Sequence, residues 1–330
     1  MKFLESETAP LGLGCWPIGG AMYAADGQSL GYTQSDDAES IRAIHAALAN
    51  GITLFDTAAA YGAGHSEKLL AKALKNRPDA LVVTKIGIAI DEKSRTLLGE
   101  DRDPANVKTA IDACLTRLDR DVIDLLLLHP NETPIDEATL LFSEMEKAMQ
   151  QGKVRAFGWS TDFIANVDAT KHLEGFKAVE HAMHVLMDAP DLQRLTKEQN
   201  LHALIRSPLA MGLLSGKYDI NTSIPNGDVR ATNQGWVQYY IDGKPNPAYM
   251  QLFDAIRELL QSEGRTVVQG ALSWLWGKSG HNIPIPGART VEQVEGLAKA
   301  LSFGPLPSQI VSEIEGLVGT EFVSHGDSSR

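Results

Sequence analysis

Short apolar runs alternate with amphipathic segments along almost the whole chain, and this alternation restricts the fold more than any other feature. Each run is bounded by turn residues and is uniformly apolar, which is typical of strands buried on both faces of a parallel sheet. The predicted strands are residues 11–15, 53–55, 81–84, 124–128, 154–158, 178–181, 203–205 and 282–285.

The segments between these runs predict helices. The clearest is 35–51, which begins at a capping residue, has acidic residues in its first turn and ends at Gly51. It places Ile41, Ile44 and Leu48 on one face, as expected for a helix packed against a sheet. Further helices are predicted at 67–76, 104–118, 136–151, 162–172, 249–263, 267–277, 290–301 and 307–318.

About eight strands alternating with helices, with no composition break, predict an α/β fold: one (β/α)8 (TIM) barrel spanning residues 1–330. The alternative is an open doubly wound sheet, whose first strand usually precedes a GxGxxG motif. Here Gly12–Pro17 lacks the last glycine, which favours the barrel. Extended loops are expected at its C-terminal face, above all the irregular 219–247, which is predicted to act as a lid.

Charge and composition exclude several classes of partner. The chain has 30 Lys and Arg against 42 Asp and Glu, a net charge of −12, which disfavours nucleic acid and anionic membranes. There is no apolar run long enough for a membrane span or a secretory signal, so a cytoplasmic location is expected. Two cysteines provide neither a disulfide scaffold nor a metal site. The partner expected is a small molecule.

Asp56, Lys85 and His129 directly follow predicted strands, and Tyr61 lies on the loop after Asp56. Since catalytic groups gather where barrel strands end, these four should converge. A phenol has a pKa of ~10, and a nearby ammonium is expected to lower it while a carboxylate orients the ammonium. Each residue alone has an ordinary structural explanation, but the set suits proton delivery to a carbonyl oxygen. Reduction would also need a hydride donor.

The chain resembles the aldo-keto reductase superfamily over nearly its whole length. The resemblance rests on blocks in the family's order, at 11–16, 51–62, 83–85, 124–129, 152–158, 207–217 and 285–289. It implies a (β/α)8 barrel that uses NADPH to reduce an aldehyde or ketone, sugar-like carbonyls included.

By this resemblance Tyr61 is the general acid, Asp56 and Lys85 tune it, and His129 orients the carbonyl. Trp16 then forms the wall of a substrate pocket shared with Tyr61 and His129. The resemblance also implies a row of cofactor contacts: Ser160, Thr161, Glu180, Arg206, Ser207, Pro208, Leu209, Gly212, Lys217, Arg230, Gly287, Arg289 and Gln293. The loop at Gly287 opens a helix and should present free N–H groups to a phosphate, with Arg289 as a clamp.

Four positions depart from the family's usual residues. Thr161 stands in place of asparagine, Glu180 in place of glutamine and Leu297 in place of asparagine. Arg206 replaces an aromatic residue, and its charge is expected to disfavour the positively charged, oxidised nicotinamide.

Two other functions fit the sequence. One is a regulatory or sensor protein that binds a nicotinamide cofactor with little turnover, and the other is a barrel enzyme that uses a phosphate site for different chemistry. The sequence indicates neither the individual substrate nor the oligomeric state.

Overall fold

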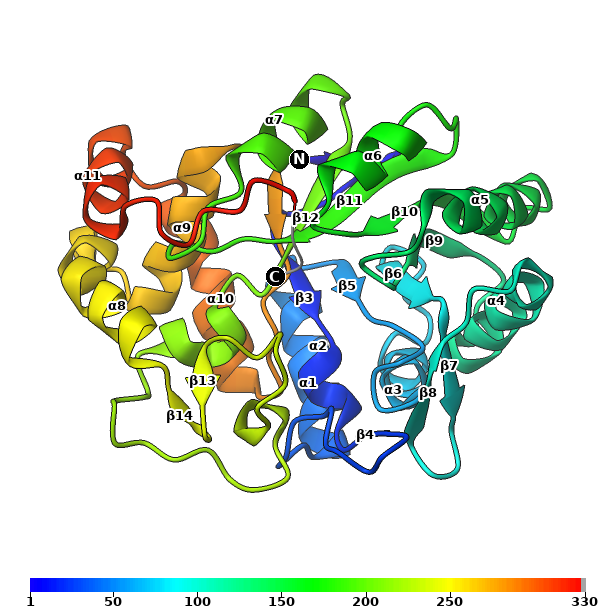
Figure 1. Cartoon of the computed structure of the whole chain (residues 1–330), viewed down its shortest axis with the longest axis horizontal. Coiled ribbons are helices and arrows are strands. Elements are labelled where there is room, and N and C mark those ends of the chain that lie inside the picture. Colours follow the sequence, from blue (N-terminus) through cyan, green and yellow to red (C-terminus); the bar gives the residue numbers. More distant parts are fainter. Residues whose placement is uncertain (328–330) are drawn as a thin grey trace.

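A computed structural model describes residues 1–327, and its centre is one sheet of eight parallel strands. The sheet curves into a nearly closed barrel, because Gly14 of the first strand bridges Gly287 just beyond the last. A Cβ atom at Gly14 would lie 2.5 Å from the carbonyl oxygen of Ile285, so only glycine permits this closure. The predicted barrel is confirmed (Figure 1). Its strands are β3 (Gly12–Gly14), β5 (Leu54–Asp56), β6 (Leu81–Ile86), β9 (Ile123–Leu128), β10 (Val154–Ser160), β11 (Phe176–Ala182), β12 (His202–Arg206) and β15 (Asn282–Pro284).

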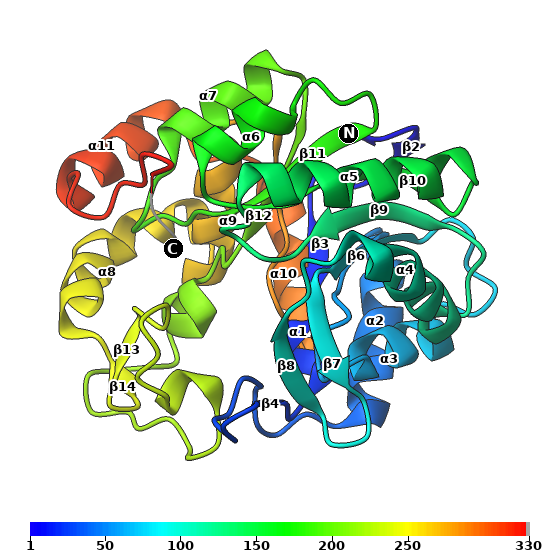
Figure 2. The ribbon, with the colours of Figure 1, turned by 45° about the vertical axis from the view of Figure 1, so that its right-hand side comes forward.

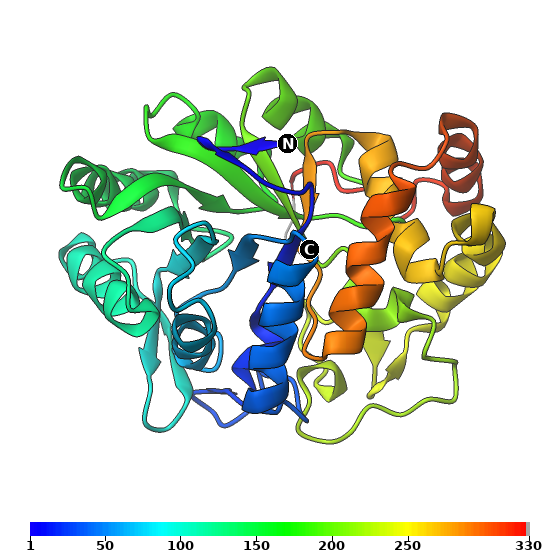
Figure 3. The same ribbon diagram turned by 180° about the vertical axis from the view of Figure 1, so that it is seen from behind.

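Helices surround this barrel, and Figure 3 shows α10 beside α2 on its outer face, where the barrel's last strand, β15, meets its first, β3. The predicted helices form within a few residues of their expected ends. Two were not predicted, the short α1 and α7. The helices are α1 (Trp16–Gly19), α2 (Asp37–Ala49), α3 (His65–Ala73), α4 (Pro104–Leu118), α5 (Ile135–Gln150), α6 (Ile164–Thr170), α7 (Pro190–Glu198), α8 (Pro247–Leu260), α9 (Val267–Lys278), α10 (Val291–Phe303) and α11 (Ser308–Val318).

The barrel interior is a small apolar cluster, separate from the layer between strands and helices. Alternate residues of each strand point inward, such as Leu54, Val83 and Leu127. The N-terminal hairpin, β1 (Lys2–Phe3) and β2 (Ser6–Glu7), adds the fully buried Phe3 to this cluster. These apolar side chains fill the interior of the barrel. The inward-pointing residues that follow them along each strand therefore lie at the open, C-terminal end of the barrel.

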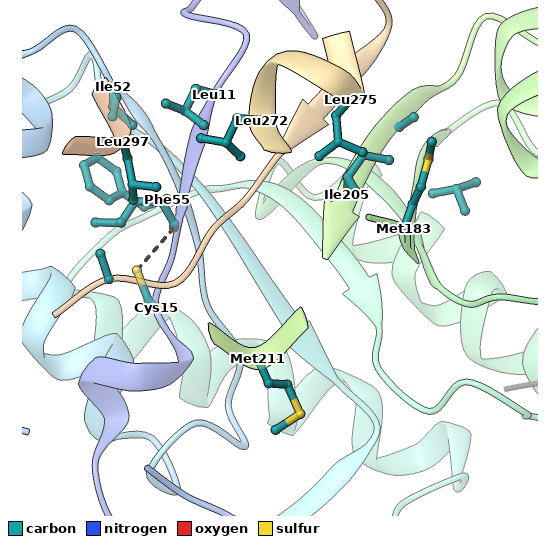
Figure 4. Close-up of a cluster of buried hydrophobic side chains, with 14 of the residues drawn as sticks. Leu11, Cys15, Ile52, Phe55, Met183, Ile205, Met211, Leu272, Leu275 and Leu297 are labelled. Carbon is teal, nitrogen blue, oxygen red and sulfur yellow. Dashed lines mark hydrogen bonds between the residues drawn. The ribbon is translucent and has the colours of Figure 1, made fainter. Parts of the chain in front are cut away.

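The outer layer is the larger part of the core. In Figure 4, Leu297 projects from α10 toward Ile52 and Phe55, and all three belong to one buried cluster. Helix α9 contacts α8, α10 and the barrel, so it is buried on nearly every side. Both of its tryptophans, Trp274 and Trp276, are therefore buried, and Trp276 donates a hydrogen bond to the Pro10 carbonyl at 2.9 Å.

Two long loops carry secondary structure of their own. Residues 86–103, which connect β6 to α4, contain the hairpin β7 (Ile88–Asp91) and β8 (Thr96–Glu100), and β4 (Tyr23–Ala24) pairs with β8. The segment 219–247, called the lid segment below, contains a 3-10 turn and the small hairpin β13 (Tyr240–Ile241) and β14 (Lys244–Pro245). Figures 1 and 2 show both hairpins toward the same edge of the molecule. Among helices of residues 1–327, none combines the length and the hydropathy that crossing a bilayer requires.

Truncating Phe3 tests the closure of the barrel interior. Phe3→Ala is expected to lower the free energy of unfolding by about 3–5 kcal/mol, because a fully buried aromatic ring leaves a cavity. Chemical denaturation followed by circular dichroism measures this. Leu98→Ala, at a 58% exposed position, is the control and should change stability by about 0.5 kcal/mol or less. A loss below 1 kcal/mol for Phe3→Ala would contradict the role given to the hairpin.

Candidate active site

The inward-pointing rows of the barrel change from apolar to polar at its C-terminal end. Leu54 is followed two residues later by Asp56, Val83 by Lys85 and Leu127 by His129. Because inward positions recur every second residue, the strand register itself brings these polar groups into one layer. Its members are Asp56, Lys85, His129, Ser160, Glu180 and Arg206.

The ammonium of Lys85 is the centre of this layer. It lies 2.6 Å from Oδ1 of Asp56 and 3.2 Å from Oε2 of Glu180, and it donates to the Thr57 carbonyl at 3.0 Å. Its contact with the Tyr61 hydroxyl is 3.2 Å. Lys85, Asp56 and Glu180 are all buried. One positive charge therefore faces two carboxylates away from solvent.

The pKa values of this cluster follow from burial and from the unequal count of charges. Burial and the neighbouring Glu180 carboxylate raise the pKa of Asp56 well above its ordinary value, and Lys85 opposes them. Burial alone would lower the pKa of Lys85, but Asp56 and Glu180 outweigh it, so the net shift is upward. Lys85 thus stays charged.

The pKa of Tyr61 does not shift in the direction predicted from the charge of Lys85 alone. Burial raises the pKa of the phenol above its ordinary value, and the opposing effect of Lys85 is smaller. The expected lowering is therefore wrong for the chain as it stands, because desolvation of the phenolate exceeds its attraction to one ammonium. Tyr61 is a neutral phenol that can donate its proton, and Lys85 is in place to stabilise the phenolate left behind.

His129 is a neutral imidazole. Burial lowers its pKa to about 3, and the positive charges of Lys85 and Arg206 add to the effect. Its ring meets the Tyr61 ring edge-on at 5.8 Å. Within residues 1–327, the buried Nδ1 of His129 and Nε1 of Trp16 have no hydrogen-bond partner. Such groups are normally satisfied, so this end of the site has unused capacity for a ligand.

A cavity of about 830 Å³ opens from this cluster and extends to α10. At the end beside the Lys85 cluster, the Trp16 ring lies 6.0 Å from that of Tyr61, 5.0 Å from that of Tyr32 and 6.0 Å from that of Trp236. The other residues that line the cavity include Ser207, Pro208, Leu209, Gly212, Lys217, Arg230, Gly287 and Arg289, and from α10 Gln293 and Leu297. Except for Thr161, every predicted site residue lines the cavity or contacts Tyr61.

The cations at the far end differ in how they are paired. Lys217 is exposed, and the Arg289 guanidinium contacts the Thr33 carbonyl; within the described chain neither forms an ion pair. The N–H groups at the start of α10 are less free than expected. Glu39 accepts from Val291 N–H at 2.9 Å, and the Gln293 side chain accepts from Arg289 N–H at 3.0 Å. An anion here would depend mainly on the side-chain cations.

Arg230 belongs to a connection between the lid segment and the loop before α2. Its guanidinium pairs with Asp228 through Nε at 2.8 Å and Nη2 at 3.0 Å, and Nη1 donates to the Tyr218 hydroxyl at 2.8 Å. Asp228 also accepts from the Thr33 amide at 3.3 Å. Arg230 lines the cavity, but through these contacts it holds the lid segment in place.

The charge of Arg206 is compensated. Its guanidinium forms an ion pair with the buried carboxylate of Asp162, which also accepts from Asn131 Nδ2 at 3.1 Å. Arg206 therefore does not present the uncompensated positive charge expected from the sequence. Thr161 is fully buried and donates to the Asn131 carbonyl at 2.9 Å. Asn131, in contrast, lines the cavity.

Several cavity residues were missed from the sequence. Asn131 follows His129 and Pro130 after β9, so the rule that selected His129 could have selected it too. Ile88, Leu97 and Glu100 come from the β7–β8 hairpin, whose alternating Ile88 and Ile90 were the available signal. Among the residues described, no group of three or more His, Cys, Asp or Glu is arranged to hold a metal ion.

A sequence profile of the Aldo/keto reductase family matches residues 10–318, which include every strand of the barrel. The chain belongs to this family. It is 29% identical to the aldo-keto reductase YhdN of Bacillus subtilis (strain 168) over 304 residues, covering 89% of this chain and 85% of that protein. The predicted membership in the aldo-keto reductases is confirmed.

Solved aldo-keto reductases share the fold. The glycerol dehydrogenase AKR11B4 from Gluconobacter oxydans is similar with a TM-score of 0.78 at 27% identity, covering 99% of this chain and 95% of that one. An aldo-keto reductase from Klebsiella pneumoniae, solved in complex with NADPH, has a TM-score of 0.66 at 21% identity, with coverages of 98% and 93%.

The burial of His129 predicts a loss of stability in acid. Between pH 6.5 and about 3 the unfolded chain binds a proton that folded His129 excludes, so stability falls as pH falls. The slope from this one group is about 1.4 kcal/mol per pH unit. The variant His129→Asn should lack this contribution, so that its unfolding free energy falls less steeply as the pH is lowered from 6 to 4. Denaturant titration at a series of pH values measures the slope. The exposed His172→Asn is the control and should keep the wild-type slope. Equal slopes in all three proteins would rule out a buried neutral His129.

Proposed function

We propose that the chain is an NADPH-dependent reductase of aldehydes and ketones in which Tyr61 is the general acid. The observation that carries the proposal is the 3.2 Å contact between the Tyr61 hydroxyl and the buried Lys85 ammonium, at the end of a cavity large enough for an extended ligand. Membership of the aldo/keto reductase family and the NADPH complex of the Klebsiella pneumoniae relative support it.

The cavity fits a dinucleotide phosphate on its own features. Its two ends differ as the two ends of such a cofactor do: buried, unpartnered polar atoms at His129 and Trp16, and available cations at Lys217 and Arg289. When bound, NADPH supplies a hydride from its nicotinamide ring. Lys217 would bind the pyrophosphate and Arg289 the 2′-phosphate, since a guanidinium binds phosphate through two parallel hydrogen bonds. Gln293 and Leu297 would border the adenine.

Each residue at the proposed catalytic end has its own role in carbonyl reduction. Neutral His129 can donate a hydrogen bond to the carbonyl oxygen without competing for its proton, because its pKa is about 3. Tyr61 delivers the proton to that oxygen, and Lys85, held by Asp56, stabilises the phenolate. Trp16, Tyr32 and Trp236 form an aromatic wall that excludes water and can stack on a carbon chain or sugar ring.

Removing the Tyr61 hydroxyl tests this assignment. Tyr61→Phe is expected to reduce turnover of a reactive aldehyde by about 10²–10⁴-fold, the usual contribution of a positioned general acid. Turnover is measured by the loss of NADPH absorbance. Binding is measured by the quenching of protein fluorescence, and the Kd for NADPH should change less than about threefold.

Tyr23→Phe makes the same chemical change at a position 41% exposed and is the matched control. Near-normal turnover by Tyr61→Phe would overturn the assignment. NADPH binding by the wild-type chain, with no oxidation across a panel of aldehydes and ketones, would favour a cofactor-binding sensor.

Arg289 is expected to distinguish the two nicotinamide cofactors. Arg289→Ala should raise the Kd for NADPH by about 10- to 100-fold, because a charge-assisted hydrogen bond contributes about 1.5–3 kcal/mol. The Kd for NADH should change little. Lys217→Ala is the companion variant and should weaken both cofactors alike. Equal losses for both cofactors in Arg289→Ala would remove its role at the 2′-phosphate.

A further inference from the structure

Glu180 gives the site a charge that its acid–base chemistry does not require. One carboxylate is enough to hold the Lys85 ammonium, and Asp56 does so at 2.6 Å. Glu180 places a second carboxylate 3.2 Å from the same ammonium while only 1% of its surface is exposed. With both carboxylates ionised, the cluster carries one uncompensated negative charge.

The neighbours of Glu180 do not remove this charge. From β10, the Ser160 hydroxyl donates to Oε1 at 3.2 Å, which orients the carboxylate without neutralising it. From β12, Arg206 forms an ion pair with Asp162, so the charges of these two residues cancel; Glu180 also raises the pKa of Arg206, but by less than Asp162 does. Asp56 on β5 and Tyr61 on the following loop add no positive charge, and Lys85 on β6 is the ammonium already counted. The compensating charge is therefore either a proton or a cationic ligand.

We propose that Glu180 makes this site prefer the oxidised cofactor, because the positively charged nicotinamide ring of NADP⁺ compensates its carboxylate and the neutral ring of NADPH does not. This inference rests on the proposed function: a nicotinamide that serves a carbonyl protonated by Tyr61 occupies the end of the cavity lined by Tyr61, His129 and Glu180. In a dry site such an attraction is much stronger than in water.

Two consequences follow for the reaction. Hydride transfer to the carbonyl leaves a cation beside Glu180, so the carboxylate stabilises the product side of reduction and slows NADP⁺ release. In the free site a proton on Asp56 compensates the second carboxylate, and binding of the cationic nicotinamide ring would release that proton to solvent. Burial and Glu180 raise the pKa of Asp56, which is consistent with a proton held there.

The test is the affinity of the full-length chain for the two cofactors, measured by isothermal titration calorimetry. Glu180→Gln keeps the shape and hydrogen-bonding capacity of the side chain and removes its charge. We expect the Kd for NADP⁺ to rise at least tenfold and that for NADPH to change less than threefold. A tenfold change in their ratio corresponds to about 30 mV in the reduction potential of the bound couple.

Matched variants separate charge from structure. Glu180→Asp keeps the charge and should keep the preference for NADP⁺. Glu132→Gln removes an exposed carboxylate that does not line the cavity and should leave the ratio unchanged. Equal weakening of both cofactors by Glu180→Gln, or no change in either, would overturn the proposal.

The wild-type chain provides a second test that does not depend on the folding of a variant. Titrations at pH 7 in buffers of different ionisation enthalpy should show that NADP⁺ releases more protons than NADPH, by up to one per site. Its affinity should also rise more steeply than that of NADPH between pH 6 and 9. Identical proton release and pH dependence for the two cofactors would overturn the inference. A chain that binds neither cofactor would refute the proposed function itself.

Discussion

The buried ammonium of Lys85 is the interaction on which the rest of the site depends. It stands directly above the apolar filling of the barrel and has no access to solvent, so its charge persists only because Asp56 and Glu180 lie within reach. Removing one partner of such a buried pair typically destabilises a protein by about 3–5 kcal/mol. The contacts that stabilise the buried ammonium are therefore also the contacts that hold it against the Tyr61 hydroxyl, the proposed general acid.

The cavity above this cluster is completed by segments that are far apart in the chain. The loop before α2, the β7–β8 hairpin and the lid segment all contribute to its lining. Asp228 joins two of them by binding Arg230 and the Thr33 amide.

The cavity can also accommodate an anionic ligand, although the chain has a net charge of −12. Within residues 1–327 Lys217 and Arg289 form no ion pair, so their local attraction can exceed the screened repulsion of distant carboxylates.

Most of the fold was predictable because one pattern repeats along the chain. Apolar runs such as 124–128 have few alternatives to a strand buried on both faces. In a barrel the residues that follow such strands, including His129, lie at one end. The hairpin at 88–100 was missed because its strands are half-exposed and only partly apolar. Lowering of the Tyr61 pKa was predicted from the attraction of Lys85; the larger effect, burial of the phenol, depends on packing that no local sequence contains.

The charged departures from the family pattern show why the partners of a residue matter more than its type. From the sequence, Arg206 was expected to bring an uncompensated positive charge to the site. In the structure Arg206 forms its ion pair with Asp162, two residues beyond Ser160, and Asp162 raises the pKa of Arg206 more than Glu180 does. Glu180 instead shares the Lys85 ammonium with Asp56. Because ion pairing at these distances is decided by which strands are neighbours, the register of the barrel determines that two carboxylates face one ammonium at this end of the cavity.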